Sequence, residues 1–512
     1  MRMMFQRALL LAGLVLVGAS PSAPQTLPGK GAVAQLRALA NSQTFPRYDR
    51  VLLLETTSDT SANVSIADLN GDGKLDVLLV KGRHWPLISR VLLGDGRGHF
   101  PIAYNLGETP YRSYSGRLVD IDGDGDLDVV LSNDTPDPKV IYLNDGKGHF
   151  HLGSSYGRAE WETRNASVVD LNGDGQPDII VANRTDKDPA NYICLNKGKG
   201  SFDTDCIPFS HESATTITHA DFNRDRLIDL VVPNRDGGQS YVYLAGAKAV
   251  YANLKRIPFG PPDAEIRMAE VADFDRDGWL DIVAIDEKRG VFIYFGQKGG
   301  TFLAGVVLSS GKVSPYALAV SDLNGDGRLD IIVGNVEAPS TIYFNGSGRH
   351  FTPIQFGDNK GTVYGFAIAD LDRDGLPDIV LARSEAPNAV YFASVGPSKI
   401  PIANETPADF ETRCGWFTNP TPANIWLYDR EAEWTIGVQG GYQVTGDWPW
   451  PRFKRGQWVV TNAGEHGYGC ACLQLRANKQ THEVIEIKSS RARPLAQCRQ
   501  DASLKKWNRR LK

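Results

Sequence analysis

Seven acidic nonapeptides are the part of this sequence that is best suited to metal chemistry. The densest copy, DIDGDGDLD at 120–128, places five aspartates in nine positions. Carboxylates this close repel one another unless a cation neutralises them. The other six copies are DLNGDGKLD (68–76), DLNGDGQPD (170–178), DFNRDRLID (221–229), DFDRDGWLD (273–281), DLNGDGRLD (322–330) and DLDRDGLPD (370–378).

The spacing of oxygen atoms in each copy predicts a calcium site, because Ca²⁺ takes about six to eight oxygen ligands. Side chains at positions 1, 3 and 5 can converge on one point. Position 7 would offer its backbone carbonyl, and the aspartate at position 9 would close the site. Glycine at position 6 permits the positive φ of a sharp turn. The predicted ligand positions are Asp68, Asn70, Asp72, Lys74 and Asp76; Asp120, Asp122, Asp124, Asp126 and Asp128; Asp170, Asn172, Asp174, Gln176 and Asp178; Asp221, Asn223, Asp225, Leu227 and Asp229; Asp273, Asp275, Asp277, Trp279 and Asp281; Asp322, Asn324, Asp326, Arg328 and Asp330; and Asp370, Asp372, Asp374, Leu376 and Asp378.

The fourth copy departs from the pattern. It has Arg226 at position 6, where the others have glycine, and Arg224 adds a second positive charge. We expect this site to be the weakest of up to seven structural calcium sites, and the site at 120–128 to be among the strongest. Charge agrees with calcium binding: the chain carries −5 overall while 399–512 carries +6, so 1–398 carries −11.

The copies recur at intervals of 48 to 52 residues, and each is followed by β-rich runs and a Gly-x-Gly turn. A helix–loop–helix calcium site is excluded because the residues at position 12 are apolar and strand-like. Four short strands per repeat are typical of a propeller blade. We therefore predict an all-β fold with a seven-bladed propeller over 44–395. We expect the N-terminal strand near 44–55 to complete the last blade; an open array is the alternative.

With these motifs, residues 45–395 resemble the calcium-binding repeats of FG-GAP or VCBS type, known from integrin alpha chains and many exported bacterial proteins. The resemblance implies a seven-bladed propeller with structural calcium. It implies no particular ligand, because such propellers host adhesion, glycan binding and occasionally catalysis.

The N-terminus has the layout of a secretory signal peptide over 1–19, with cleavage expected between 19 and 25. Arg2 and Arg7 precede an apolar run, Ala8 to Val17, that is too short to span a membrane. We expect an exported, bacterial protein without a membrane span; the sequence leaves periplasm or medium open.

A basic, tryptophan-rich unit is predicted at 410–507, after a linker at 396–409. The segments RCGWF, QGGYQ and YGCACL make it resemble a bacterial domain family of unknown function. Six cysteines in an exported chain indicate disulfides: we expect Cys194–Cys206 and two bonds among Cys414, Cys470, Cys472 and Cys498, neither joining Cys470 to Cys472. A zinc site at Cys470 and Cys472 is a weaker alternative, and the tryptophans could fill a core or form a sugar-stacking face.

The ligand is expected at the end of the blades opposite the acidic loops. The residues predicted there are Arg83, Trp85, Tyr111, Arg112, Asn133, Trp161, Arg164, Arg184, Arg235, Arg289, Tyr316, Tyr364 and Arg383. The alternative is a solvated rim without a ligand. No nucleophile, metalloprotease or phosphate-loop motif is present, so we predict non-catalytic binding of a glycan or protein at the cell envelope, and no nucleic-acid partner. A polysaccharide lyase or dehydratase is the alternative class; the oligomeric state stays open.

Overall fold

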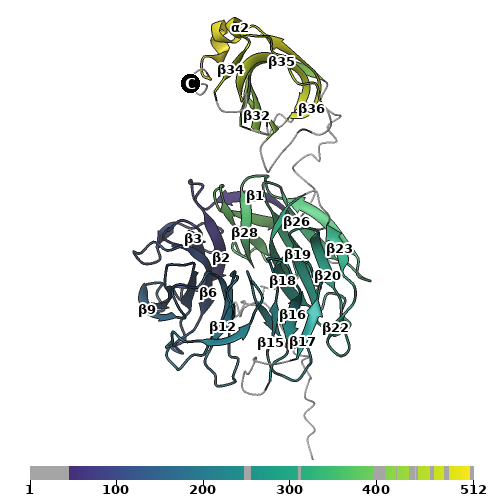
Figure 1. Cartoon of the computed structure of the whole chain (residues 1–512). Helices are drawn as coiled ribbons and strands as arrows, with labels where there is room; N and C mark the ends of the chain where they lie inside the picture. Colours follow the sequence, from purple (N-terminus) through teal and green to yellow (C-terminus); the bar gives the residue numbers. More distant parts are fainter. Residues whose placement is uncertain are drawn as a thin grey trace, which may run out of the picture. The chain divides into compact units, whose positions relative to one another are not determined.

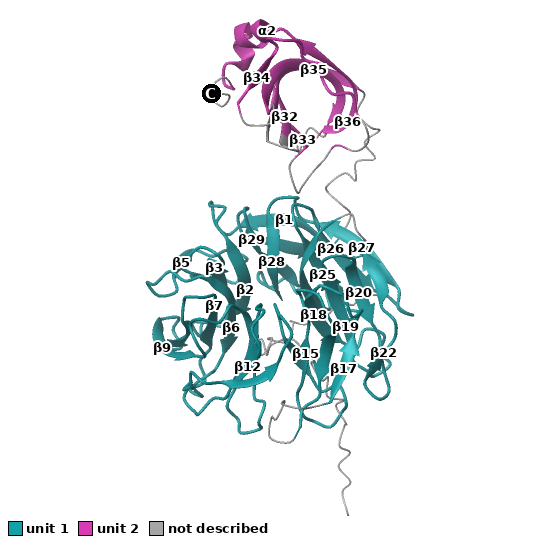
Figure 2. Ribbon diagram, in the orientation of Figure 1, with its two compact units in different colours: residues 1–395 teal, residues 396–512 magenta. Residues whose placement is uncertain are grey.

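A computed structural model of the chain describes residues 45–246, 255–309, 313–395, 410–421, 424–437, 444, 448–461, 466–477, 482 and 484–507. The predicted signal peptide and linker lie outside the described residues. The chain divides into two compact units, residues 1–395 and 396–512 (Figure 2). The described residues are nearly all β, as predicted.

The described part of the first unit contains seven four-stranded antiparallel sheets, arranged around a common centre (Figure 1). Six of them consist of strands consecutive in the chain, apart from a small hairpin inserted in the fifth. The strands of the first three sheets are β2 Ser61–Ala67, β3 Asp76–Lys81, β4 Arg90–Leu93 and β5 Ile102–Asn105; β6 Ser113–Val119, β7 Asp128–Asn133, β8 Lys139–Asn144 and β9 Phe150–Tyr156; and β10 Thr163–Val169, β11 Asp178–Asn183, β12 Asn191–Cys194 and β13 Ile207–Ser210.

The remaining sheets follow the same order. Their strands are β14 Thr218–Ala220, β15 Asp229–Val232, β16 Ser240–Tyr243 and β17 Arg256–Phe259; β18 Ile266–Ala272, β19 Asp281–Asp286, β20 Gly290–Tyr294 and β23 Val306–Ser309, with the hairpin β21 Gly296–Gln297 and β22 Thr301–Phe302; β24 Pro315–Ser321, β25 Asp330–Asn335, β26 Ser340–Asn345 and β27 Phe351–Phe356; and β28 Thr362–Ala369, β29 Asp378–Ser384, β30 Ala389–Ser394 and β1 Arg47–Leu53.

The seventh sheet closes the ring with a strand from the other end of the chain. Strand β1 pairs antiparallel with β30, with Val51 opposite Tyr391 and Leu53 opposite Ala389. The predicted N-terminal strand in the last sheet is therefore present. Pairing these two strands covers the outer edge of β30, which would otherwise expose unpaired backbone groups.

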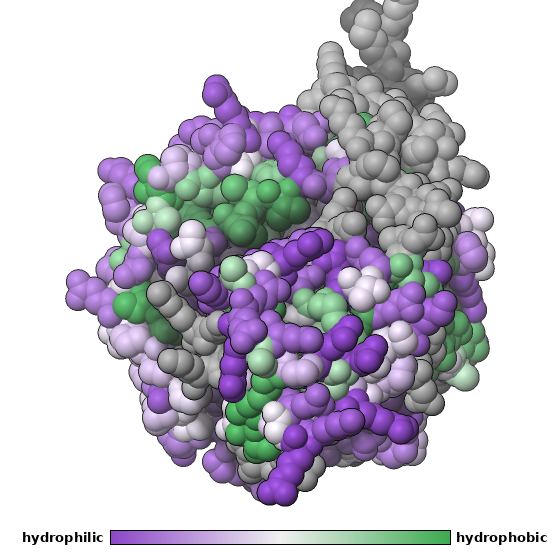
Figure 3. Space-filling view, turned by 90° about the horizontal axis from the view of Figure 1, so that it is seen from above, coloured by the Kyte–Doolittle hydropathy of each residue, from purple (hydrophilic) through white to green (hydrophobic). Residues whose placement is uncertain are grey.

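The second strand of every sheet is buried along its whole length, from β3 to β29. Runs such as DIIVAN at 178–183 show why: β-branched residues fill both faces because a neighbouring sheet packs on each side. Outer strands are more exposed, with large apolar side chains such as Ile102 and Leu152 in solvent. One face of the molecule is largely hydrophilic with separate apolar patches (Figure 3).

The first strands of the sheets form the centre of the ring. Neighbouring first strands contact one another, for example β2 with β6 and β24 with β28. Polar side chains join them: Arg117 Nε donates to the Ala166 carbonyl at 2.9 Å, and Thr218 Oγ1 donates to the Ala269 carbonyl at 2.8 Å. These bonds hold the first strands of neighbouring sheets to one another.

The second unit is built on one six-stranded sheet that curves (Figure 2, magenta). Its strand order is β33-β32-β31-β35-β34, and β36 pairs with the rest of β35. The elements are β31 Glu411–Thr421, β32 Asn424–Tyr428, β33 Glu433–Gly437, β34 Trp458–Val460, β35 Gly467–Ala477, β36 Val484–Arg493, α2 Leu495–Gln500 and the 3₁₀ turn η1 Ala502–Leu504. Within its described residues, no helix of the chain is long and apolar enough to cross a membrane.

All three disulfides form as predicted. They join Cys194 to Cys206, Cys414 to Cys472 and Cys470 to Cys498, so no described cysteine is free for a zinc site. Cys472 lies directly opposite Cys414 of β31, whereas Cys470 bonds to Cys498 of α2, so each of the two finds a different partner.

The tryptophans of this unit divide between core and surface. Trp416 and Trp434 are buried, whereas Trp450 is 42% exposed. The buried Arg413 lies over the Trp434 ring and pairs with Asp429 at 2.7 Å. Core packing therefore explains part of the tryptophan content.

Candidate functional site

The acidic nonapeptides form the connections between the first and second strand of each sheet, as expected. The loop at 120–128 leaves β6 and enters β7, and its backbone turns through positive φ at Gly123 and Gly125. The fourth loop keeps the same turn although it has no glycine there: Arg224 and Arg226 adopt φ of 63° and 71°. Arg226 therefore accepts the left-handed conformation, at an expected cost of about 1–2 kcal/mol.

Backbone amides organise the carboxylates at positions 1 to 5. Asp120 accepts hydrogen bonds from the N–H groups of Gly123, Asp124 and Gly125 at 2.8 to 3.1 Å. Asp124 in turn accepts from the Asp126 N–H at 3.0 Å. These bonds hold the side chains of Asp120 and Asp124 against the backbone of the loop.

The aspartate at position 9 has a structural role that the sequence did not reveal. Asp128 is fully buried, and its two oxygens accept from the Ile121 N–H at 3.1 Å and the Asn144 N–H at 2.9 Å. It thereby ties the loop to the end of the third strand. The same pair of bonds recurs in all seven loops, at Asp76, Asp128, Asp178, Asp229, Asp281, Asp330 and Asp378.

Burial makes these carboxylates difficult to ionise. It raises the pKa of Asp128 to about 7 and that of Asp330 to about 8, even though the backbone N–H bonds act in the opposite direction. A nearby cation favours the ionised form of a carboxylate. An ion in the loop would therefore lower the pKa of the position-9 aspartate.

Three loops bring three carboxylates close enough to share one ion. In each, one oxygen from every member lies within 4.8 Å of the others; the groups are Asp120, Asp122 and Asp128; Asp273, Asp275 and Asp281; and Asp370, Asp372 and Asp374. These are the three loops with aspartate at position 3, where the other four have asparagine. All-oxygen donor sets of this kind fit a hard cation such as Ca²⁺.

Arginines reach two of these three loops. Arg349 pairs with Asp275 at 2.6 Å, and Arg50 pairs with Asp372. None of the ion pairs between described residues involves the acids of 120–128. Of the three carboxylate groups, only this one is without an internal cation.

A second polar region lies at the opposite end of the same strands. We name it the inner rim and define it by the starts of the first strands and the residues after the second strands: Arg83, Tyr114, Asp134, Arg164, Arg184, Arg235, Asp236, Arg267, Glu287, Tyr316 and Tyr364. Six of these, Arg83, Arg164, Arg184, Arg235, Tyr316 and Tyr364, were predicted at this end of the blades. Arg267 was not.

Ion pairs along the inner rim join successive sheets. Arg164 pairs with Asp134 at 2.5 Å. Arg184 pairs with Asp236 at 2.6 Å and Arg235 pairs with Glu287 at 2.7 Å, and each of these pairs spans 52 residues of sequence. The repeat thus places a charged side chain from one sheet against the next.

Two tyrosines meet at the rim between the sixth and seventh sheets. The Tyr364 hydroxyl donates to the Tyr316 hydroxyl at 3.0 Å, and the Arg267 guanidinium lies 3.2 Å from the centre of the Tyr316 ring. Burial acts to raise the pKa of Tyr316, but Arg267, the Tyr364 hydroxyl, Arg235 and Arg83 outweigh it, and the pKa lies below its usual value. Three arginines thus act on the Tyr316 hydroxyl.

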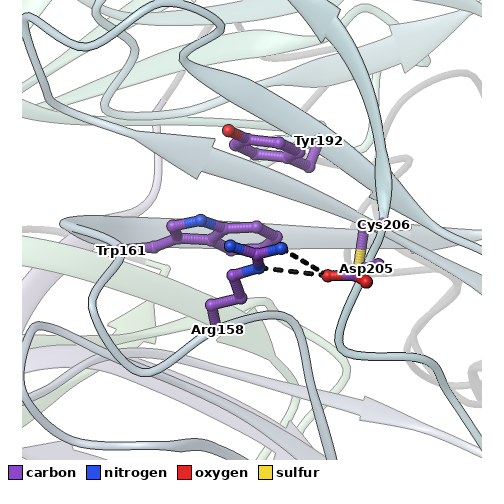
Figure 4. A pocket seen from close by; sticks show the side chains of 5 residues that line it. All are labelled: Arg158, Trp161, Tyr192, Asp205 and Cys206. Atoms are coloured by element: carbon purple, nitrogen blue, oxygen red, sulfur yellow. Dashed lines mark hydrogen bonds and ion pairs between the residues drawn. The ribbon is translucent and has the colours of Figure 1, made fainter.

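Other residues of the predicted ligand face lie elsewhere. Trp161 stacks on Tyr192 with ring centres 4.1 Å apart, in a cavity of about 200 Å³ that Arg158, Asp205 and Cys206 also line (Figure 4). Arg158 and Asp205 form an ion pair across it at 2.6 Å.

The other predicted face residues are paired, buried or isolated. Arg112 pairs with Asp137, and Arg289 with Asp286 and Asp263. Trp85 is 68% exposed. Three residues do not contribute to an exposed face, because Tyr111 packs in the core, Asn133 is buried, and Arg383 is 1% exposed with its charge directed to Asp358.

A signal in the sequence could have found the rim tyrosines and Arg267 together. The residue six positions before each nonapeptide is Ala62, Tyr114, Arg164, Thr215, Arg267, Tyr316 and Tyr364 in turn. Five of these seven are arginine or tyrosine. Alignment of the repeats on their first aspartate therefore shows the rim as one column.

Comparison with known proteins agrees with this geometry. The FG-GAP-like repeat model matches residues 120–181, 170–232, 221–284, 273–333 and 322–381, which together cover half of the chain. The chain belongs to the FG-GAP repeat family. The second unit matches a protein family of unknown function, DUF4087, over residues 408–505.

Relatives of this FG-GAP protein are distant. Cartilage acidic protein 1 of Mus musculus is 26% identical over 178 residues, which cover 31% of this chain and 27% of that protein. The chain thus spans about a quarter of that relative.

Solved structures with a similar fold include BBS1N in complex with ARL6DN, with 12% identity, a TM-score of 0.46, and coverage of 69% of this chain and 98% of that one. YCF48 bound to a D1 peptide has 12% identity, a TM-score of 0.44 and coverage of 69% and 99%. The likeness at these values concerns the fold and carries no argument on function.

Proposed function

We propose that this protein is an exported, calcium-stabilised binding module that captures a glycan or a protein at the cell envelope through the inner rim. The FG-GAP propeller fold suggests a binding or adhesion module. The acidic loops would hold calcium at one end of the sheets, and the inner rim would meet the ligand at the other. Disulfides and the absence of a membrane-crossing helix among the described residues are consistent with export.

One observation carries the proposal: arginines and tyrosines from different sheets gather at the rim with partly exposed side chains. Arg164 lies at the start of the first strand of its sheet, and Arg184 and Arg235 follow the second strands of two other sheets, so all three lie on one edge. Arg and Tyr are the residue types enriched where proteins bind partners. A purely structural rim would not need this composition in five of seven repeats.

The proposal is tested by capture of ligands with the full chain. We expect immobilised protein in millimolar calcium to retain an envelope glycan or protein, and a chelator to reduce the retained amount because the loops position the blades. Arg235→Gln should reduce capture, whereas Arg158→Gln, an exposed arginine outside the rim, should not. Equal capture by both variants would place the ligand elsewhere.

A second candidate function, cleavage of an acidic glycan by elimination, is favoured by Tyr316. An elimination needs a base that takes the proton beside the sugar carboxylate, while a cation stabilises the resulting negative charge. The electron pair then forms a C=C bond, the bond to the leaving oxygen breaks, and that oxygen takes up a proton. Tyr316, with its lowered pKa, and Arg267 have the chemistry for these two roles. Ultraviolet absorbance of an unsaturated product would separate this reaction from binding alone.

A further inference from the structure

Six residues at the inner rim form a compact unit that we call the tyrosine–arginine cluster: Tyr316, Tyr364, Arg83, Arg235, Arg267 and Glu287. Arg83 lies over the Tyr364 ring at 3.7 Å, and Arg267 lies over the Tyr316 ring at 3.2 Å. Glu287 accepts from Arg235 at 2.7 Å and from Arg267 at 3.1 Å. The cluster combines side chains of five sheets.

The cluster is short of negative charge. It contains three guanidinium groups and one carboxylate, Glu287, which both Arg235 and Arg267 share. Within the described residues, Arg83 has no carboxylate partner: its Nη1 donates to the Ser384 hydroxyl at 3.0 Å, and its buried Nε has no hydrogen-bond partner. The charge of Arg83 is therefore not neutralised by a carboxylate, and two further arginines lie in the same cluster, which favours binding of an anion.

The polar character of the cluster limits the chemical classes of ligand that it can bind. Every member is charged or carries a hydroxyl group, and the two tyrosine hydroxyls lie 3.0 Å apart beside the arginines. Guanidinium groups bind carboxylates through two parallel hydrogen bonds, and tyrosine hydroxyls can bond to the hydroxyl groups of a sugar. Because Arg83 and Arg267 each cover one tyrosine ring, less ring surface is left for the apolar side chains that an acidic peptide would bring.

We propose that the tyrosine–arginine cluster binds the carboxylate of a uronic acid, either as a free sugar or as a unit of an acidic glycan. The inference rests on the proposed function, because it takes the inner rim to be the ligand face. Arg83 contacts the carboxylate, Arg235 supplies the second positive charge, and the tyrosine hydroxyls contact the sugar ring.

The test is titration calorimetry on the full chain in millimolar calcium. The probes are tetragalacturonate, galacturonic acid, maltotetraose as the neutral sugar and polyglutamate as the acidic peptide. We expect tetragalacturonate to bind, maltotetraose not to bind, and the affinity to fall as salt rises. The signal with galacturonic acid shows whether one sugar unit is sufficient or the glycan chain is required.

Variants locate the site. Arg83→Gln and Arg235→Gln should each weaken tetragalacturonate binding by about tenfold or more, as expected for a lost charged hydrogen bond. Arg158→Gln should leave it unchanged. Arg83 has a strained φ of 57°, so its variant is interpreted only if its melting temperature is preserved. If it is not preserved, Arg235→Gln decides the question, because this variant leaves Glu287 paired with Arg267.

Three results would overturn the inference. Capture of an envelope ligand without uronate binding would refute it and leave the proposed function standing. Equal binding of polyglutamate, with the same sensitivity to Arg83→Gln, would assign the cluster to acidic peptides instead. Uronate binding that neither rim variant weakens would place the site elsewhere. Failure to capture any envelope ligand would contradict the proposed function itself.

Discussion

The two ends of the propeller sheets are built from the same repeat but differ in the contacts that hold their side chains. At the loop end, each nonapeptide supplies the carboxylate and amide oxygens of its own loop. Its last aspartate is hydrogen-bonded within its own sheet, as Asp128 is to Asn144. At the inner rim, a side chain meets the next sheet, as Arg184 meets Asp236. Interactions within one sheet therefore shape each loop, with added contacts from a neighbouring sheet such as Arg349 to Asp275, whereas ion pairs between sheets dominate the rim.

Stability therefore depends mainly on the loop end, and ligand recognition mainly on the inner rim. Substitution of a loop residue should lower the free energy of unfolding, because buried backbone groups and a bound ion depend on the loop. Substitution of a rim residue should change the free energy of unfolding little but weaken ligand binding strongly, because the rim side chains are partly exposed.

The largest effect is expected from calcium removal. Sites in extracellular modules often bind calcium at about 10⁻⁴–10⁻³ M. At millimolar calcium, each site then adds roughly 0.5–1.5 kcal/mol, which gives several kcal/mol over the ring. Calorimetric melting with calcium and with a chelator should show a clearly lower midpoint without the ion. Magnesium at equal concentration is the control and should protect less.

Next in size is the position-9 aspartate. Asp128→Ala leaves the buried N–H groups of Ile121 and Asn144 without acceptors, which should destabilise the protein by about 2–3 kcal/mol. Because these bonds need no ion, denaturant unfolding should show the loss in chelator as well as in calcium. Asp126→Ala is the matched control in the same loop, since position 7 would ligate through its backbone. A loss confined to calcium-containing buffer would mean that Asp128 acts only as a ligand.

A smaller gain is expected at the fourth loop. Arg226→Gly relieves a left-handed φ of 71°, and we expect the protein to be more stable by roughly 0.5–1 kcal/mol after the flexibility of glycine in the unfolded chain is included. Arg224→Gly is the control: it also relieves a positive φ, but it removes the contact of Arg224 with the Trp279 ring at 4.1 Å. Thermal melts of the two variants should therefore differ, and an equal shift would contradict this account.

The smallest stability effect is expected at the rim. Arg235→Gln removes one partly screened ion pair, and Glu287 keeps its bond to Arg267 at 3.1 Å. We expect a change below about 1 kcal/mol in the free energy of unfolding. A loss as large as that of Asp128→Ala would show that the rim, too, is mainly structural, and would weaken its assignment to ligand binding.

The sequence predicted those features that a short segment decides by itself. Glycines and oxygens at fixed positions specify each loop, and the same spacing repeated every 48 to 52 residues specifies the sheets and their closure by β1. The Cys194–Cys206 bond was predicted from the hairpin that joins two neighbouring strands, whereas the pairing among the four C-terminal cysteines was left open. In each case the information lies within one repeat or one strand pair.

Features that depend on packing between distant segments were missed. Nothing in the nonapeptide shows that Asp128 bonds to the third strand, because Asn144 is 16 residues away. Nothing in the sequence near Arg267 shows that its guanidinium group lies over the ring of Tyr316 in the next sheet. Tyr111 and Arg383 are of residue types that are common on binding faces, but their side chains are buried.

The central claim, that the acidic loops hold calcium unequally, is tested most directly by ion counting. Native mass spectrometry of protein stripped with chelator and returned to sub-millimolar calcium should show several bound ions in the wild type. Asp124→Ala should remove about one ion, because its loop has three clustered carboxylates without an internal arginine. Asp225→Ala should remove little, because Arg224 and Arg226 flank it. Absence of bound calcium, or the reverse order of the two variants, would contradict the account.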